Sequence, residues 1–100
     1  MYCVGEYPTP DENLHLDQID YLKKRYPNID IGYSTHEKPD NYTPISIAIA
    51  KGANIFEKHV GLETSQYKLN KYSANLQQVN KWLKNAKDAY SKCGSEKDIL

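Results

Sequence analysis

The sequence has 100 residues, which is enough for one small domain. Its 13 Lys and Arg residues balance 13 Asp and Glu residues, so net charge favours neither nucleic acid nor a membrane surface as a partner. No apolar run reaches the roughly 18 residues of a membrane span, and the start of the chain lacks the features of a signal peptide, so a cytoplasmic location is expected.

The first half of the chain alternates a strand pattern with a helix pattern. Met1–Tyr7 predicts a short buried strand, which ends at Pro8–Pro10 because proline cannot donate to a strand ladder. Asp11–Tyr26 carries apolar residues at helical spacing and predicts a helix. Ile29–Ser34 then predicts the second strand. The alternation indicates parallel strands joined by helices.

The next stretch repeats this order. Thr43 followed by Pro44 is typical of a helix start, with Thr43 as N-cap and Pro44 as the first helical residue. Pro44–Lys51 is almost wholly apolar, which predicts a short buried helix. Gly52 suits the positive φ of a helix C-terminus, and Asn54–His59 predicts the third strand.

The last part of the chain is a long loop followed by a helix. Gly61–Ala74 has little periodicity, and loops of this length in compact domains are often functional. Asn75 suits the N-cap of the last helix, Gly94 its end, and Ser95–Leu100 a frayed tail. An apolar stripe recurs along this helix at Leu76, Val79, Trp82, Leu83, Ala86, Ala89 and Tyr90.

This order of elements predicts an α/β fold. A closed barrel of eight βα units needs about 250 residues, so residues 1–94 predict a partial TIM barrel of three consecutive parallel βα units. The inward faces of the strands are expected to carry Cys3, either Ile31 or Tyr33, and Ile55. Cys3 and Cys93 lie at opposite ends without metal-ligand spacing, and are predicted to be free thiols.

The strand ends carry the candidate functional residues. Strand alternation puts Ile55, Glu57 and His59 on one face, where buried polar groups cost free energy unless they meet a partner. Parallel α/β folds gather their functional groups beyond the carboxyl ends of the strands. Tyr7, His36 and His59 all lie at such ends, which predicts a shared site built around a two-histidine corner.

Three motifs, taken together, resemble one enzyme family. They are Cys3-Val4-(x)-(x)-Tyr7-Pro8-Thr9-Pro10, Gly32-(x)-Ser34-(x)-His36 and Glu57-Lys58-His59, and in that order they resemble the sialic acid synthases, also called N-acetylneuraminate synthases. The resemblance covers nearly the whole chain and matches the sixth, seventh and eighth βα units of that family's TIM barrel. It implies a carbon–carbon bond-forming transferase of carbohydrate biosynthesis that condenses phosphoenolpyruvate with an aminosugar aldehyde, acts as a homodimer when intact, and is inactive as this fragment alone.

The same resemblance implies roles for individual residues. His36 and His59 match the family's two protein metal ligands, for a manganese or magnesium ion, and neutral imidazole does bind first-row divalent ions. Ser34 matches a residue that contacts phosphoenolpyruvate, and Tyr7 matches one that lines the sugar site. Glu57 matches an inward carboxylate near the metal, as a catalytic proton-transfer group or a partner of a ligand.

The sequence also departs from the family's pattern. Gly5 stands where the family often carries Asn, and Thr35 where it often carries Asp. Leu69 replaces an Asp in the loop after the third strand, which implies an acceptor other than N-acetylmannosamine. Asn70 and Lys71, with the neighbouring Tyr72 and Ser73, are the candidates for reading that acceptor.

Two alternative functions and several plainer interpretations stay open at this point. The chain could come from another metal-dependent TIM-barrel lyase or aldolase, or it could be a non-catalytic partial-barrel binding module. His36 could be a loop histidine without a ligand, and Lys71 a solvated loop lysine. Glu57 could serve as the structural ion-pair partner of a lysine such as Lys58, from elsewhere in a whole barrel.

Overall fold

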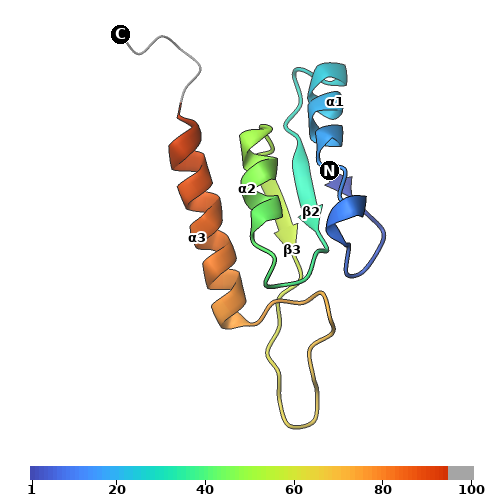
Figure 1. Ribbon diagram of the computed structural model, residues 1–100, viewed down its shortest axis with the longest axis vertical. Coiled ribbons are helices and arrows are strands. Elements are labelled where there is room, and N and C mark those ends of the chain that lie inside the picture. Colours follow the sequence, from blue (N-terminus) through green and yellow to red (C-terminus); the bar gives the residue numbers. More distant parts are fainter. Residues whose placement is uncertain (95–100) are drawn as a thin grey trace.

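Three parallel strands form one sheet in the order β1-β2-β3. The computed structural model describes residues 1–94 (Figure 1), so the tail predicted at 95–100 lies outside the described residues. The elements in chain order are β1 (Tyr2–Cys3), the 3-10 turn η1 (Asp11–Asn13), α1 (Asp17–Arg25), β2 (Gly32–Thr35), α2 (Thr43–Ala50), β3 (Ile55–Lys58) and α3 (Leu76–Cys93). The predicted α/β partial barrel is therefore confirmed.

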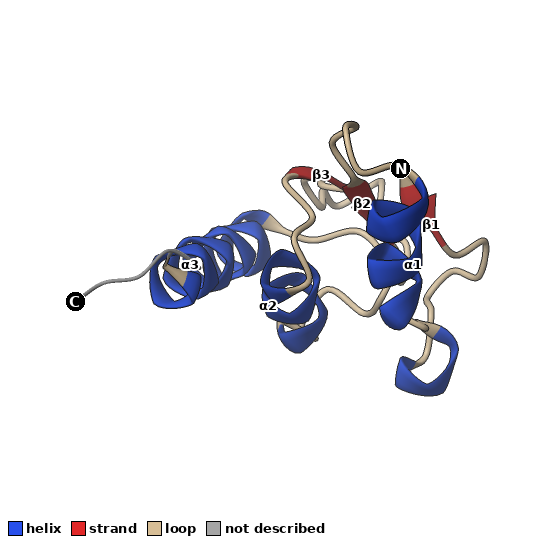
Figure 2. Ribbon diagram, turned by 90° about the horizontal axis from the view of Figure 1, so that it is seen from above, coloured by secondary structure: helices blue, strands red, loops and turns tan. Residues whose placement is uncertain are grey.

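The helices cover one face of the sheet and create the core there (Figure 2). In the first of two clusters, Ile19 of α1 and Ala48 of α2 pack against Tyr33 of β2. In the second, Ile45 and Ile49 of α2 pack against Trp82 of α3. Both clusters share Phe56 of β3, so the sheet and the three helices form one continuous apolar layer.

The opposite face of the sheet carries a different set of side chains. The register pairs Cys3 with Ser34, and Ser34 with Glu57, so these three side chains lie at one level. Gly32 and Ile55 form the level before them. The expectation that Ile31 or Tyr33 points to this face is wrong, because both are buried in the helix-side core, where Tyr33 is only 1% exposed.

Several predicted boundaries need correction in the first half of the chain. The first strand keeps two residues instead of extending to Tyr7, because residues 5–8 bend away from the sheet. The predicted helix over Asp11–Tyr26 is interrupted, since His15 adopts a positive φ of 46° between η1 and α1. The second strand begins at Gly32, three residues later than expected.

The second half follows the prediction more closely. α2 is buried along Pro44, Ile45, Ala48 and Ile49 as expected, but Tyr42 occupies its N-cap in place of Thr43. Gly52 has the positive φ predicted for it, 97°. Asn75 caps α3 through a reciprocal pair of hydrogen bonds with Gln78. Along the predicted stripe of α3, Trp82 is buried, whereas Leu76, Leu83 and Tyr90 are exposed.

The connection between β3 and α3 is the long loop that extends beyond the layered part of the molecule in Figure 1. Backbone hydrogen bonds between Gly61 and Ala74, and between Ala74 and His59, close its base. Cys3 and Cys93 are both free, as predicted. None of the helices within residues 1–94 has the length and apolar character needed to span a membrane.

Candidate active site

The carboxyl ends of β2 and β3 bring His36 and His59 together. Their ring centroids lie 5.2 Å apart, with the planes inclined by 43°. His36 is buried and His59 is exposed. Burial lowers the pKa of His36, and the neighbouring His59 contributes in the same direction. The corner therefore favours a neutral imidazole at His36, which is the form that can donate a lone pair to a metal ion.

Two tyrosines pack around this corner. Tyr7, from the loop after β1, presents its ring edge-on to His36 with centroids 4.3 Å apart. Tyr72, from the long loop, lies 5.1 Å from the His59 ring and 5.2 Å from the Tyr7 ring. The two tyrosines thus pack beside the histidines, although they come from loops that are far apart in the sequence.

Three polar side chains lie one level below the histidines. Ser34 donates a hydrogen bond from Oγ to Oε1 of Glu57 at 2.8 Å. Cys3 places its Sγ 3.5 Å from Nδ1 of His36. The interpretation of Glu57 as the partner of Lys58 is therefore not supported, since Glu57 pairs with Ser34 while Lys58 pairs with Glu37.

The donor set of the corner suits a divalent cation with an open coordination sphere. An ion about 2.1 Å from one nitrogen of each ring would hold two ring centres roughly 5 Å apart, close to the separation of His36 and His59. Within residues 1–94, no three His, Cys, Asp or Glu side chains group as a metal site. Two imidazoles from this chain would leave the other positions for water or substrate oxygen.

Thr9 fastens the loop that carries Tyr7 to the end of β2. Its backbone N–H donates to the carbonyl of His36 at 2.8 Å, and its Oγ1 donates to the carbonyl of Glu6 at 2.6 Å. Thr9 is buried. The Pro-Thr-Pro segment of the motif therefore holds Tyr7 beside His36, whereas the strand itself ends earlier, at Cys3.

Glu37 and Lys58 form a buried charged pair that sequence reasoning missed. Glu37 is fully buried, and its Oε1 lies 3.7 Å from Nζ of Lys58. Burial raises the pKa of Glu37 and lowers the pKa of Lys58, and in each case the partner's charge opposes that shift. A signal was present in the sequence, because strand alternation turns Lys58 away from Glu57 and His59, toward the apolar helix side.

Among the predicted residues of the long loop, the contact with the histidines comes from Tyr72. Asn70 accepts a hydrogen bond from the backbone N–H of Tyr72 at 3.2 Å, and Lys71 is exposed. Leu69 packs toward Gly61, where an added Cβ would lie 2.6 Å from its Cδ2. Of this segment it is Tyr72 that reaches the histidines, and Asn70 holds the turn that presents it.

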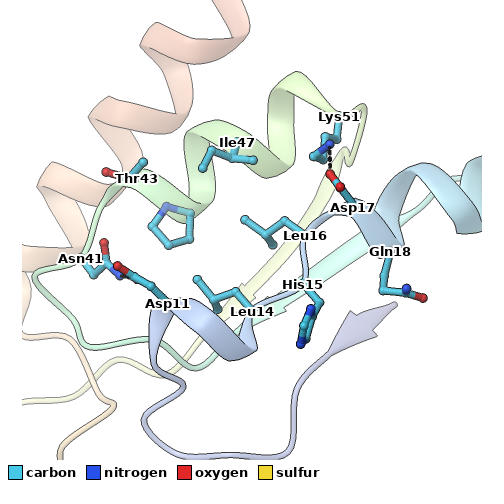
Figure 3. Close-up of a pocket in the computed structure, with 11 residues that line it drawn as sticks. Asp11, Leu14, His15, Leu16, Asp17, Gln18, Asn41, Thr43, Ile47 and Lys51 are labelled. Carbon is cyan, nitrogen blue, oxygen red and sulfur yellow. Dashed lines mark hydrogen bonds and ion pairs between the residues drawn. The ribbon is translucent and has the colours of Figure 1, made fainter.

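A separate cavity of about 560 Å³ lies between α2 and the segment leading into α1 (Figure 3). Four of its polar side chains form two pairs. Lys51 bonds Asp17 at 2.6 Å, and Asn41 donates to Asp11 at 2.7 Å. His15 also lines this cavity and is exposed. The cavity is therefore distinct from the two-histidine corner, with which it shares no lining residue.

The fold and the site define the class of the protein: a TIM-barrel α/β chain with polar residues gathered at the carboxyl ends of parallel strands. Residues 1–98 match the NeuB family, and the chain belongs to that family. The sequence is 41% identical over 66 residues to N-acetylneuraminate-9-phosphate synthase of Drosophila melanogaster, a match that covers 66% of this chain and 17% of that protein.

Solved structures give the same assignment. A putative spore coat polysaccharide biosynthesis protein E from Chromobacterium violaceum superposes with a TM-score of 0.93 at 53% identity, covering 98% of this chain and 29% of that one. An N-acetylneuraminic acid synthetase from Leptospira borgpetersenii, solved with citrate, gives a TM-score of 0.83 at 29% identity, covering 98% of this chain and 34% of that one. The chain thus spans about a third or less of the length of these relatives.

Proposed function

We propose that this chain contributes the metal-binding part of a synthase that joins phosphoenolpyruvate to an N-acylated aminosugar in carbohydrate biosynthesis. The observation that carries the proposal is the pair of imidazoles at neighbouring strand ends, with ring centroids 5.2 Å apart. Membership of the NeuB family supports it, as do the names of the synthases to which the chain is similar.

The reaction divides among the residues of the site by their chemistry. A divalent ion, manganese or magnesium, held by His36 and His59 would supply Lewis-acid polarisation of the sugar aldehyde. A new carbon–carbon bond would form between that aldehyde carbon and the methylene carbon of phosphoenolpyruvate, after which water adds and phosphate leaves. Tyr7 would orient the acceptor next to His36, since its ring contacts that imidazole edge-on.

Ser34 and Glu57 lie one level below the histidines and would contact phosphoenolpyruvate and transfer a proton, respectively. The hydroxyl of Ser34 can turn from Oε1 of Glu57, 2.8 Å away, to an oxygen of phosphoenolpyruvate. Glu57 would then take a proton from the water that adds and return one to the aldehyde oxygen, which becomes a hydroxyl, because Glu57 lies on the same strand face as His59. We assign the catalytic proton to Glu57 and substrate contacts to Ser34 and Tyr7.

The experiment uses the intact enzyme that contains this chain. Phosphate release is measured with phosphoenolpyruvate and a panel of N-acylated aminosugars, before and after chelation, with manganese or magnesium added back. Metal-dependent release that requires both substrates is the expected result. Cleavage or condensation of a sugar phosphate without phosphoenolpyruvate would favour a lyase or aldolase instead, and absence of turnover with every acceptor would favour a binding module.

A further inference from the structure

Behind the two histidines, on the helix side of the sheet, lies the buried pair of Glu37 and Lys58. Glu37 follows His36 directly, and Lys58 directly precedes His59. Glu37 is 0% exposed and the side chain of Lys58 is 2% exposed, with 3.7 Å between Oε1 and Nζ. The pair therefore joins the ends of β2 and β3 at the two positions adjacent to the imidazoles.

Two further contacts connect the pair to side chains of β2. The hydroxyl of Tyr33 donates to Oε2 of Glu37 at 3.3 Å, and Nζ of Lys58 lies 3.5 Å from Oγ1 of Thr35. On its other side, Nζ of Lys58 stands 5.6 Å from the centre of the Trp82 ring, a cation–π distance. A buried ion pair with few partners adds little net stability, and an apolar pair of similar volume often serves as well.

The backbone does not provide an equivalent link between the histidines. The last position at which β2 pairs with β3 is Thr35 opposite Lys58. Beyond it, the carbonyl of His36 accepts from Thr9 and that of His59 accepts from Ala74. Each histidine is thus held to its own neighbouring loop. At this level the strand ends are connected by the ion contact of Glu37 with Lys58, in which Oε1 of Glu37 makes no hydrogen bond.

We propose that the Glu37–Lys58 pair positions His36 and His59 relative to each other and so determines how tightly the corner holds a divalent cation. The inference rests on the proposed function. Metal–ligand distances tolerate deviations of only about 0.2 Å, so a small spreading of the strand ends would weaken binding. Removing partners that orient metal ligands typically costs 10–100-fold in affinity.

The test compares variants of the intact enzyme by metal affinity and by spectroscopy. Glu37→Gln, Lys58→Met and the double variant Glu37→Leu/Lys58→Met are titrated with Mn²⁺, and the absorption spectrum of bound Co²⁺ is recorded. Lys51→Met is the matched control, because Lys51 pairs with Asp17 at the surface, away from the corner. We expect affinity to fall 10–100-fold in all three variants and the Co²⁺ spectrum to change, while Lys51→Met binds as the wild type does.

The double variant separates positioning from folding. An apolar pair of similar volume can restore thermal stability, so weak metal binding by a stable double variant supports the inference. Lys58→Arg, which keeps the charge, should retain most of the affinity. Wild-type affinity and an unchanged Co²⁺ spectrum in the variants would overturn the inference alone, whereas a wild-type enzyme that binds no Mn²⁺ would overturn the metal role and the inference together.

Discussion

Ser34 and Glu57 face each other across β2 and β3, and the Ser34 hydroxyl donates to the Glu57 carboxylate at 2.8 Å. This hydrogen bond lies on the same sheet face as the histidines, one level nearer the start of the strands. A carboxylate held by a single hydroxyl can still change partners, which suits a group that exchanges a proton during a reaction.

The first prediction concerns Glu57. Glu57→Gln should lower kcat of the intact enzyme by roughly 10²-fold or more, because the amide keeps the bond to Ser34 but cannot accept a proton. The metal affinity should change little, since Glu57 is not one of the two proposed ligands. Steady-state phosphate release checks this result. Glu63→Gln, at an exposed carboxylate of the long loop, is the control, and unchanged turnover in Glu57→Gln would remove the proton-transfer role.

The second prediction concerns the histidines and pH. His36→Ala and His59→Ala should each lower kcat/KM by about 10²-fold or more, since each removes a ligand of the polarising ion. Manganese affinity should weaken as the pH falls, because a protonated imidazole cannot donate its lone pair. The pKa of His36 is lowered by burial, so its share of the loss should come at more acidic pH than for an ordinary histidine.

Calorimetric titration of Mn²⁺ between pH 5 and 8 measures this dependence. His15→Ala is the matched control, because His15 is an exposed histidine that lines a separate cavity. An affinity that stays constant down to pH 5, or full activity in either corner variant, would contradict the assignment of His36 and His59.

The third prediction concerns the acceptor. The intact enzyme should prefer an aminosugar other than N-acetylmannosamine, because Leu69 stands where the family usually has an Asp and packs toward Gly61. Tyr72, which touches the His59 ring, should limit the acceptor's size, so Tyr72→Ala should raise KM for the preferred acceptor and broaden the panel that reacts. The Gly5→Asn variant, which introduces the residue that the family often carries at this position, should fold normally, because a Cβ added at Gly5 meets no atom within 4 Å.

Competition between aminosugars, expressed as ratios of kcat/KM, measures the selectivity. Tyr67→Ala serves as control, because Tyr67 is an exposed tyrosine of the same loop. A strong preference of the wild-type enzyme for N-acetylmannosamine would contradict the prediction based on Leu69.

The fourth prediction concerns stability. Ile45 is fully buried between α2 and α3, so Ile45→Ala should cost about 2–5 kcal/mol through lost burial and the cavity that remains. Ile47, on the same helix, is 38% exposed, and Ile47→Ala should cost less than about 1 kcal/mol. Denaturant unfolding of the intact enzyme gives both values, and equal losses would contradict the described core.

The fifth prediction concerns residues 1–100 expressed alone. They should show no synthase activity and should be oligomeric or aggregated, because β1 and β3 keep unpaired edges and Ile55 is 47% exposed on the inner face. Size-exclusion chromatography and a phosphate-release assay test the two halves separately. A monodisperse monomer that unfolds cooperatively would contradict the first half, and phosphate release that requires both substrates would contradict the second.

How far the sequence could predict this molecule depends on the kind of residue. His36 and His59 could be found because strand ends in a parallel fold converge, and the two rings do lie together. The side chains on the inner face of β2 could not be identified from the sequence. All residues of Ile31–Thr35 are buried, so the strand shows no alternation of buried and exposed positions. A register error of one residue exchanges the faces, so the sequence alone favours Ile31 or Tyr33 at the inward position that Ser34 holds.

Glu37 illustrates a second limit. It falls in a stretch that reads as a polar loop, Thr35–Tyr42, yet it is fully buried. Its partner Lys58 is 21 positions away in the chain, so only tertiary structure joins the charges. Tyr72 is similar, since no local pattern indicates that this one residue of a long aperiodic loop folds back onto His59.

The parallel register places the residues of the site at two successive levels along the strands. Cys3, Ser34 and Glu57 share one level, and the histidines occupy the next, about 7 Å further along the strands because side chains on one face repeat every second residue. The packed rings of His36, His59, Tyr7 and Tyr72 therefore lie nearer the carboxyl ends of the strands than the carboxylate of Glu57 does. The alignment of the three strands by itself thus separates the hydroxyl–carboxylate pair from the imidazoles along the strand axis.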